Sequence, residues 1–263
     1  MAAQERSTET DAVIEIENLH KSYREKVAVA GVSFAVGPGQ IMGLVGPNGA
    51  GKTTIIRAAC GIHPPSGGVI RIAGRDVVKE PVDAKRRLAY VPDDPKLFGT
   101  LTVWEHLRFI ASAYDVQDRF EERADQLLRR FDLTARRWDM AGELSRGMRQ
   151  KLAICCAYLH DPQALFLDEP LTGLDPRGIR TMKDSIREQA QRGVAVVISS
   201  HLLSLVEDMC SHLLVLHHGR RLYFGPLGAL REAAGDFDRE ATLEDIFLHL
   251  TEDGAEPAGV TDA

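Results

Sequence analysis

The sequence lacks the features that mark membrane-spanning, secreted and nucleic-acid-binding proteins. Its apolar runs all fall short of the about 18 residues that a membrane-spanning helix needs. The first eleven residues are polar and lack the apolar core of a signal peptide, so we expect the chain to stay in the cytosol. Basic residues show no excess: 32 Lys and Arg face 38 Asp and Glu, a formal net charge of −6. Without a basic stripe, direct nucleic-acid binding is not expected.

Cysteine is also scarce, with four residues in 263. Cys60, Cys155, Cys156 and Cys210 lack metal-ligand spacing and lie in apolar or helical segments. We therefore expect reduced, buried thiols rather than a zinc site or disulfides. The length suits one large core with a smaller appended subdomain.

The most informative segment present is a glycine-rich loop directly after the apolar residues 41–45. Its glycines let backbone N–H groups turn toward phosphate oxygens, Lys52 adds a cation, and the hydroxyl of Thr53 suits Mg²⁺. A helix predicted from Lys52 to Cys60 adds the partial positive charge of its N-terminus. The loop predicts nucleoside triphosphate binding by Gly46, Pro47, Asn48, Gly49, Ala50, Gly51, Lys52, Thr53 and Thr54.

Short apolar runs predict a mostly parallel sheet covered on both faces. Residues 41–45, 164–167 and 194–198 are apolar and are each followed by polar residues. Such an arrangement places functional groups at the carboxyl ends of buried strands, where α/β sheets bind ligands. Further short strands predict an antiparallel β layer beside this sheet, at residues 12–17, 32–36 and 69–72.

The remaining pattern predicts one domain over residues 12–250 with an inserted helical subdomain at about 100–159. Apolar residues recur at helical spacing in that insert, and a hairpin is predicted at 213–216 and 221–224, before weaker helical segments that end near Leu250. Residues 1–11 and 251–263 are expected to be flexible tails.

Two consecutive carboxylates follow the buried strand at residues 164–167. Asp168 is expected to hold Mg²⁺ through its water shell, because its strand points at the loop that carries Thr53. Glu169 points elsewhere and can polarise a water for attack on a γ-phosphate. The alternative is that the two carboxylates merely mark a strand end before Pro170.

A second helix N-terminus able to receive an anion is predicted at Ser145. Ser145 suits an N-cap, and Gly147 permits close backbone approach. If two copies face each other head to tail, this helix of one copy can close over the nucleotide of the other. Taken alone, the segment also fits an ordinary capped helix.

Two further side chains are candidates for nucleotide contact. His201 ends a buried strand at the same sheet edge and is expected to hydrogen-bond the γ-phosphate. Tyr23, expected in a polar loop after the first strand, can stack on an adenine ring. The alternative interpretations are a structural histidine and a surface aromatic.

Together these residues resemble the nucleotide-binding subunit of an ATP-binding cassette (ABC) transporter, over residues 12–250. The motifs stand in the family's order: Tyr23 for adenine, the Walker A loop at 46–54, the Q-loop at 90–93, the signature at 144–148, Walker B at 165–168, the D-loop at 173–175 and the switch His201. The resemblance implies a P-loop NTPase fold, RecA-like, with ATP and Mg²⁺ as cofactors and Glu169 as general base.

The sequence departs from the family pattern at two motifs. Asp93 replaces the usual Q-loop glutamine, where it can approach Mg²⁺ or its waters but brings negative charge near the triphosphate. The signature reads Leu-Ser-Arg-Gly-Met, which keeps Ser145 and Gly147. This variant, with residues 243–248, is similar to subunits that serve ABC-2 exporters.

The resemblance implies an ATPase that closes around two ATP molecules, as a homodimer or with a different cassette. Its partners would be separate transmembrane permease subunits, of ABC-2 type, which would hold it on the inner face of the cell membrane. The alternative is a soluble single-cassette ATPase acting on a non-transport assembly. A neighbouring reading frame with about six apolar spans would favour transport. A metabolic kinase would have no use for Ser145 and His201.

Overall fold

The main sheet of the protein is built around strands buried on both faces. A computed structural model describes residues 12–233, 243–245 and 247. Six strands lie in the order β10-β9-β3-β8-β7-β6. All neighbours in this sheet are parallel except β9 and β10, which form a hairpin. The strands are β3 (Ile41–Val45), β6 (Leu88–Val91), β7 (Ala164–Asp168), β8 (Ala195–Ser199), β9 (His212–His217) and β10 (Arg220–Pro226).

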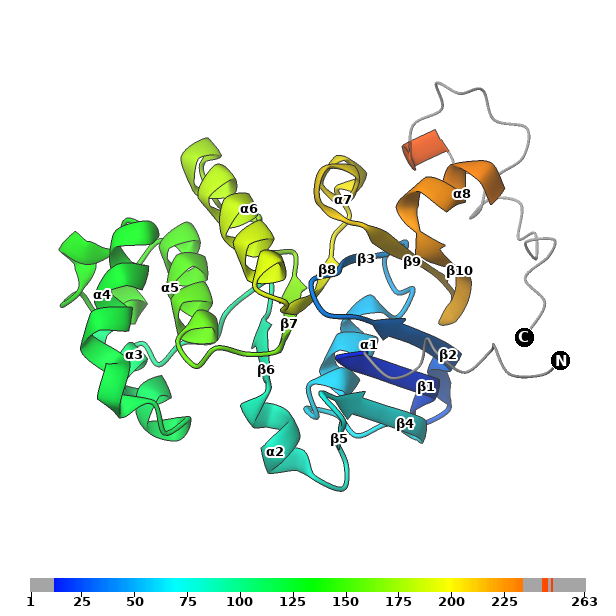
Figure 1. The fold of residues 1–263 in the computed structure, drawn as a ribbon, viewed down its shortest axis with the longest axis horizontal. Helices are drawn as coiled ribbons and strands as arrows, with labels where there is room; N and C mark the ends of the chain where they lie inside the picture. The colour runs from blue at the N-terminus through cyan, green and yellow to red at the C-terminus, as the bar shows by residue number, and fades with distance from the viewer. Residues whose placement is uncertain (1–11, 234–242, 246, 248–263) are drawn as a thin grey trace, which may run out of the picture.

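A second, antiparallel sheet lies beside the first at one end of the molecule (Figure 1). Its order is β2-β1-β4-β5. Its strands are β1 (Ile14–Tyr23), β2 (Lys26–Val36), β4 (Gly67–Ile72) and β5 (Arg75–Asp76). The mostly parallel sheet and the antiparallel layer predicted from the sequence are both confirmed.

Successive side chains of β3 and β7 point to opposite faces of the main sheet, and they thereby divide the core into two clusters. In β3, Met42 and Leu44 pack with the antiparallel layer, whereas Ile41 and Val45 pack on the opposite side. In β7, Phe166 faces the antiparallel layer, and its neighbours face away. Both strands read as unbroken apolar runs because successive side chains point to opposite faces, and both faces are buried.

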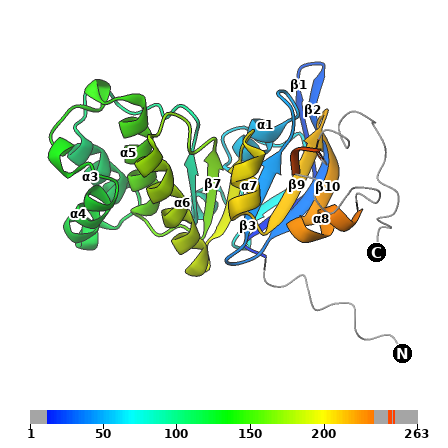
Figure 2. The same cartoon turned by 90° about the horizontal axis from the view of Figure 1, so that it is seen from above.

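The helices are arranged around these sheets. The helices α3, α4 and α5 gather at the end far from the antiparallel sheet, and α6 lies between them and the main sheet in both views (Figures 1 and 2). The described helices are α1 (Lys52–Ala59), α2 (Pro81–Arg86), α3 (Val103–Ala113), α4 (Phe120–Arg130), α5 (Arg146–Tyr158), α6 (Pro176–Gln191), α7 (Leu203–Met209) and α8 (Leu227–Ala233), with single 3₁₀ turns at Gln117–Arg119, Thr134–Arg136 and Ala141–Glu143.

Local capping explains where several of these helices begin. The hydroxyl of Thr102 accepts from the N–H of Glu105, whose carboxylate accepts from the N–H of Thr102, a capping box that starts α3. Asp175 caps α6, and proline at the first helical position has the φ that a helix start requires. None of the helices in the described part of the chain is long and apolar enough to cross a membrane.

The structure differs from the sequence expectations in several details, and it contains helices at Pro81–Arg86 and Pro176–Gln191 that were not predicted. β6 was not predicted as a strand, because its run is only four residues long and follows two arginines. Tyr23 is the last residue of β1 rather than part of a loop. All four cysteines are free, but Cys156 is only half-buried. The predicted tails and most of the segment near Leu250 lie outside the described residues.

Substitution of Phe166 by alanine tests the two-sided core. Phe166 is fully buried on β7, which lies between β8 and β6 in the main sheet. Removal of its ring leaves a cavity, so we expect the free energy of unfolding to fall by about 3–5 kcal/mol in urea titration. Val78, which is 56% exposed, provides the control: Val78→Ala should change stability by less than about 0.5 kcal/mol. Equal effects of the two substitutions would contradict this description of the core.

Candidate active site

The loop between β3 and α1 turns its backbone into a cradle at the carboxyl edge of the main sheet. At Gly51, φ is 109° and a Cβ would lie 2.8 Å from the carbonyl oxygen of Ala28. At Gly46, a Cβ would lie 2.5 Å from the carbonyl oxygen of Leu216. Glycine is therefore required at both positions by close backbone contacts. No side chain caps α1, whose first N–H groups are thus available to an anion.

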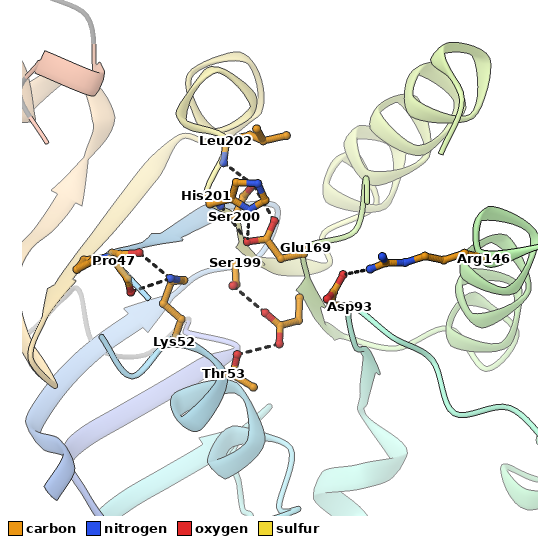
Figure 3. Close-up of polar contacts among 12 residues, drawn as sticks. Pro47, Lys52, Thr53, Asp93, Arg146, Glu169, Ser199, Ser200, His201 and Leu202 are labelled. Carbon is orange, nitrogen blue, oxygen red and sulfur yellow. Dashed lines mark hydrogen bonds and ion pairs between the residues drawn. The ribbon is translucent and has the colours of Figure 1, made fainter. Parts of the chain in front are cut away.

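Lys52 folds back over this loop. Its Nζ donates to the carbonyl oxygens of Gly46 at 2.6 Å and Pro47 at 3.2 Å (Figure 3). Burial lowers the pKa of Lys52, and the carboxylates of Glu169 and Asp168 oppose that shift. The Lys52 ammonium thus lies in the cradle with two carboxylates nearby. When a nucleotide binds, its phosphate oxygens would replace the carbonyl oxygens of Gly46 and Pro47 as stronger, charged partners of Lys52.

Asp168 joins the ends of three separate segments. Its Oδ2 accepts from Thr53 Oγ1 at 3.1 Å and its Oδ1 from Ser199 Oγ at 2.8 Å (Figure 3). The side chain is buried, and each carboxylate oxygen accepts a hydrogen bond from a protein hydroxyl. Ser199 was not singled out from the sequence, although its place at the end of the buried strand β8 was a usable signal.

Glu169 lies one residue further along in a strained conformation. Its φ is 50°, in the left-handed region that a glutamate rarely adopts. Its Oε1 accepts from the backbone N–H of His201 at 3.0 Å and lies 2.8 Å from His201 Nδ1. The two consecutive carboxylates serve different partners, since Asp168 accepts from Thr53 and Ser199 whereas Glu169 accepts from His201.

His201 follows the end of β8 by two residues, at the sheet edge expected from the sequence. Its ring contacts Glu169, and its side chain is 64% exposed. Nδ1 lies within hydrogen-bond distance of the Glu169 carboxylate, and this contact holds the ring beside the strand ends. An exposed ring held in this way remains accessible to a ligand.

Lys52, Thr53, Asp168 and Glu169 border one hollow of about 800 Å³ between the loop, the sheet edge and the antiparallel layer, whereas His201 does not line it. Tyr23 and Asp93 line the same hollow. Tyr23 is 40% exposed, and the Nζ of Lys21 lies 5.0 Å from its ring centroid. The predicted site residues in the lining are Tyr23, Asn48, Gly49, Ala50, Gly51, Lys52, Thr53, Thr54, Asp93, Asp168 and Glu169.

Ser145 and Gly147 do not border this hollow. Ser145 caps α5 by accepting from the N–H of Met148 at 3.3 Å, and its side chain is exposed. A Cβ on Gly147 would lie 2.5 Å from the carbonyl oxygen of Gly173, so this glycine permits close packing within the chain itself. The contact joins the start of α5 to the loop after β7.

The oxygen groups beside the loop fit a hard cation that is shared with phosphate. In the described part of the chain, no three His, Cys, Asp or Glu side chains gather closely enough to hold a metal alone. Thr53 and Asp168 nevertheless place a hydroxyl and a carboxylate together, with Asp93 on the same hollow. Mg²⁺ commonly binds through one or two such protein oxygens plus phosphates and waters.

The parallel sheet, the loop and the uncapped helix α1 define a P-loop nucleotide hydrolase. Residues 29–172 match the family described as ABC transporter. The chain is 35% identical to the ABC-type transporter ATP-binding protein EcsA of Bacillus subtilis, covering 93% of this chain and 98% of that protein. The chain belongs to the ATP-binding subunits of ABC transporters, which are ATPases.

Two further comparisons agree with this family. The chain is 34% identical to the Nod factor export ATP-binding protein I of Sinorhizobium fredii, over 85% of this chain and 65% of that protein. A solved structure described as the ATP binding subunit of an ABC transporter has a TM-score of 0.86 and 35% identity, covering 90% of this chain and 99% of that one. Sequence and fold therefore agree along nearly the whole described chain.

Substitution of Lys52 by alanine tests the cradle. We expect the affinity for fluorescent ATP to fall by at least about tenfold, because one charge-assisted contact to phosphate is worth roughly 1.5–3 kcal/mol. Lys79, which is 81% exposed and does not border the hollow, provides a control of the same charge. Lys79→Ala should bind ATP as the unmodified chain does, and unchanged affinity in Lys52→Ala would count against the cradle.

Proposed function

We propose that this chain is the ATPase subunit of an exporter, acting as one half of a dimer that closes around two Mg²⁺–ATP. The observation that supports this most is the convergence of the Lys52 cradle, the Thr53–Asp168 pair and the Glu169–His201 pair on one edge of the sheet. One chain thus carries nearly all the groups that phosphoryl transfer to water requires.

The roles of the groups follow from their chemistry. The cradle and Lys52 bind the phosphates, and Tyr23 stacks on the adenine. Mg²⁺ would be held by Thr53 and by Asp168, directly or through water, with Asp93 able to approach it; the ion would neutralise charge that develops on the phosphates. Glu169 accepts a proton from the attacking water, and His201 orients that carboxylate and contacts the γ-phosphate.

The exposed Ser145 cap supports a second chain as the missing half of the site. The start of α5 carries free N–H groups and lies outside its own chain's hollow. In a head-to-tail dimer, Ser145 and Gly147 of one chain would face the γ-phosphate held by the other. The γ-phosphate would then join the two surfaces, and its loss on hydrolysis would release them.

A groove beside the nucleotide hollow suits a separate permease. Its volume is about 850 Å³, and its apolar lining includes Phe98, Phe109 and Ile110. Phe98 and Phe109 are 57% and 50% exposed and meet edge to face at 5.6 Å. Asp93 borders both this groove and the nucleotide hollow, so a membrane subunit seated here would contact the segment that also borders ATP.

Export rather than import is supported by the similarity to relatives such as the Nod factor export protein. The Leu-Ser-Arg-Gly-Met signature supports a permease of ABC-2 type, and such a partner would hold the chain on the inner face of the cell membrane. A cassette that serves a non-transport assembly remains the alternative. Purification of the tagged chain from host membranes distinguishes the two, since only a transporter subunit should retain a multi-span partner.

Substitution of Glu169 by glutamine tests the base. The change keeps shape but removes the proton acceptor, so we expect ATP binding to persist and kcat to fall by about 10²–10⁴-fold. A dimer should accumulate with ATP in sedimentation analysis, because the γ-phosphate is no longer removed. Glu121→Gln on α4 is the control and should hydrolyse ATP normally. Unaltered turnover in Glu169→Gln would remove Glu169 from this role.

Substitution of Phe109 by glutamate tests the groove. A buried charge at a protein interface is costly, so we expect the permease to be lost on co-purification. ATP affinity of the isolated chain should not change, because the side chain is half exposed and borders only the groove. Val82→Glu is the matched control, since Val82 is 65% exposed on α2. Equal retention of permease by both variants would place the docking surface elsewhere.

A further inference from the structure

An ion pair connects the helical end of the molecule to the edge of the main sheet. Nη2 of Arg146 donates to Oδ1 of Asp93 at 2.9 Å (Figure 3). Arg146 is the first residue of α5, and Asp93 follows the end of β6 by two residues. Each of these residues is a departure from the family's usual motif, and in the folded chain the two departures meet.

Packing directs Arg146 toward this partner. The aliphatic part of its side chain lies over Gly173, where an added Cβ would be 3.3 Å from Cγ and 3.2 Å from Cδ of Arg146. The neighbouring Gly147 packs against the carbonyl of the same Gly173. The start of α5 thus rests on the loop after β7, and the guanidinium extends past it to Asp93 (Figure 3).

Two neighbouring charged side chains have partners of their own, although the pKa of Asp94 is lowered by Lys96 and, to a smaller extent, by Arg146. Asp94 pairs with Lys96, and Nη1 of Arg149 donates to the carbonyl oxygen of Leu144 at 2.6 Å. Asp93, by contrast, also borders the hollow that contains Asp168 and Glu169, so it adds negative charge to an edge that is already acidic. Arg146 offsets that charge from the helical side.

Both members of the pair would gain a stronger partner when Mg²⁺–ATP is enclosed between two chains. Asp93 borders the hollow where Thr53 and Asp168 would hold the divalent ion. Arg146 is adjacent to Ser145, at the helix start that would face the partner chain's triphosphate. The pair itself is weak, because its side chains are 49% and 46% exposed and are screened by water.

We propose that the Asp93–Arg146 ion pair is a nucleotide-released latch, which holds α5 against the sheet edge until enclosed Mg²⁺–ATP draws its two members apart. Release rests on the proposed dimer, whereas the restraint without nucleotide does not. Arg146 and Asp93 are thus positioning residues for hydrolysis: they set when the signature helix is free to turn toward the other chain. The coupling is reciprocal, so removal of the latch should ease closure.

Hydrogen exchange of the nucleotide-free chain tests the restraint. We expect amides of residues 92–99 and 144–150 to exchange about two- to fivefold faster in Asp93→Asn and in Arg146→Gln, as loss of one exposed pair allows. The double variant should match the single ones, because each substitution removes the same contact. Arg146→Lys keeps the charge and should resemble the unmodified chain.

A matched control separates this pair from ordinary ion pairs. Arg136 pairs with Asp139 at 3.0 Å with comparable exposure, but within the helical end alone. Arg136→Gln should leave exchange at 92–99 and 144–150 unchanged. The difference between Arg146→Gln and the unmodified chain should shrink in 0.5 M NaCl, since salt screens exposed charges. Additive effects in the double variant, or no effect in either single one, would overturn the restraint.

The same measurement with Mg²⁺–ATP tests release. In the Glu169→Gln background, the exchange difference at residues 144–150 should disappear once ATP is saturating, and Arg146→Gln should need about two- to fivefold less ATP for half-maximal dimerisation. A difference that persists in a chain that does dimerise would make the pair a permanent strut and overturn the latch. If the Glu169→Gln chain forms no dimer with ATP at all, the proposed function fails instead.

Discussion

The hydrogen bonds that Asp168 accepts from Thr53 and Ser199 hold the candidate site together. They tie the first turn of α1 to the ends of β7 and β8, three segments that are far apart in sequence. A buried carboxylate without such partners would be costly, so the three segments can only take positions that satisfy it. The phosphate cradle and the hydrolytic groups therefore share one fixed frame, set by the parallel order of β3, β8 and β7.

The left-handed backbone at Glu169 depends on that frame. A glutamate in this region is strained, and it is retained here because its N–H donates to the carbonyl of Ser199 at 2.9 Å while its carboxylate receives the N–H of His201. The strain turns Glu169 away from Asp168. The end of β7 can thereby supply one carboxylate to a cation and a second carboxylate to a water. The left-handed backbone at Glu169 sets the direction of the second carboxylate apart from that of the first.

The sequence predicted those parts of the molecule that follow from local pattern. Residues 41–45 and 164–167 read as buried strands because both of their faces are covered, and the glycine-rich loop has few other uses. The strand β6 was missed because four residues after two arginines carry little signal. The Glu169–His201 contact could not be derived either, since it depends on how two turns at neighbouring strand ends approach each other in space.

The pairing of Asp93 with Arg146 is another contact that could not be predicted from the sequence. Each residue, considered alone, is an exchange of an uncharged side chain for a charged one, and Asp93 by itself worsens an acidic edge. In the folded chain the two opposite charges offset each other. The sequence does not show this pairing, because 53 residues separate Asp93 from Arg146. Hydrogen bonds to the buried Asp168 hold the strand ends and α1 together, whereas a half-exposed pair joins the helical end to them. A structure built in this way can keep its catalytic geometry while its helices move, because the contact that must break is a half-exposed ion pair and contributes little to stability.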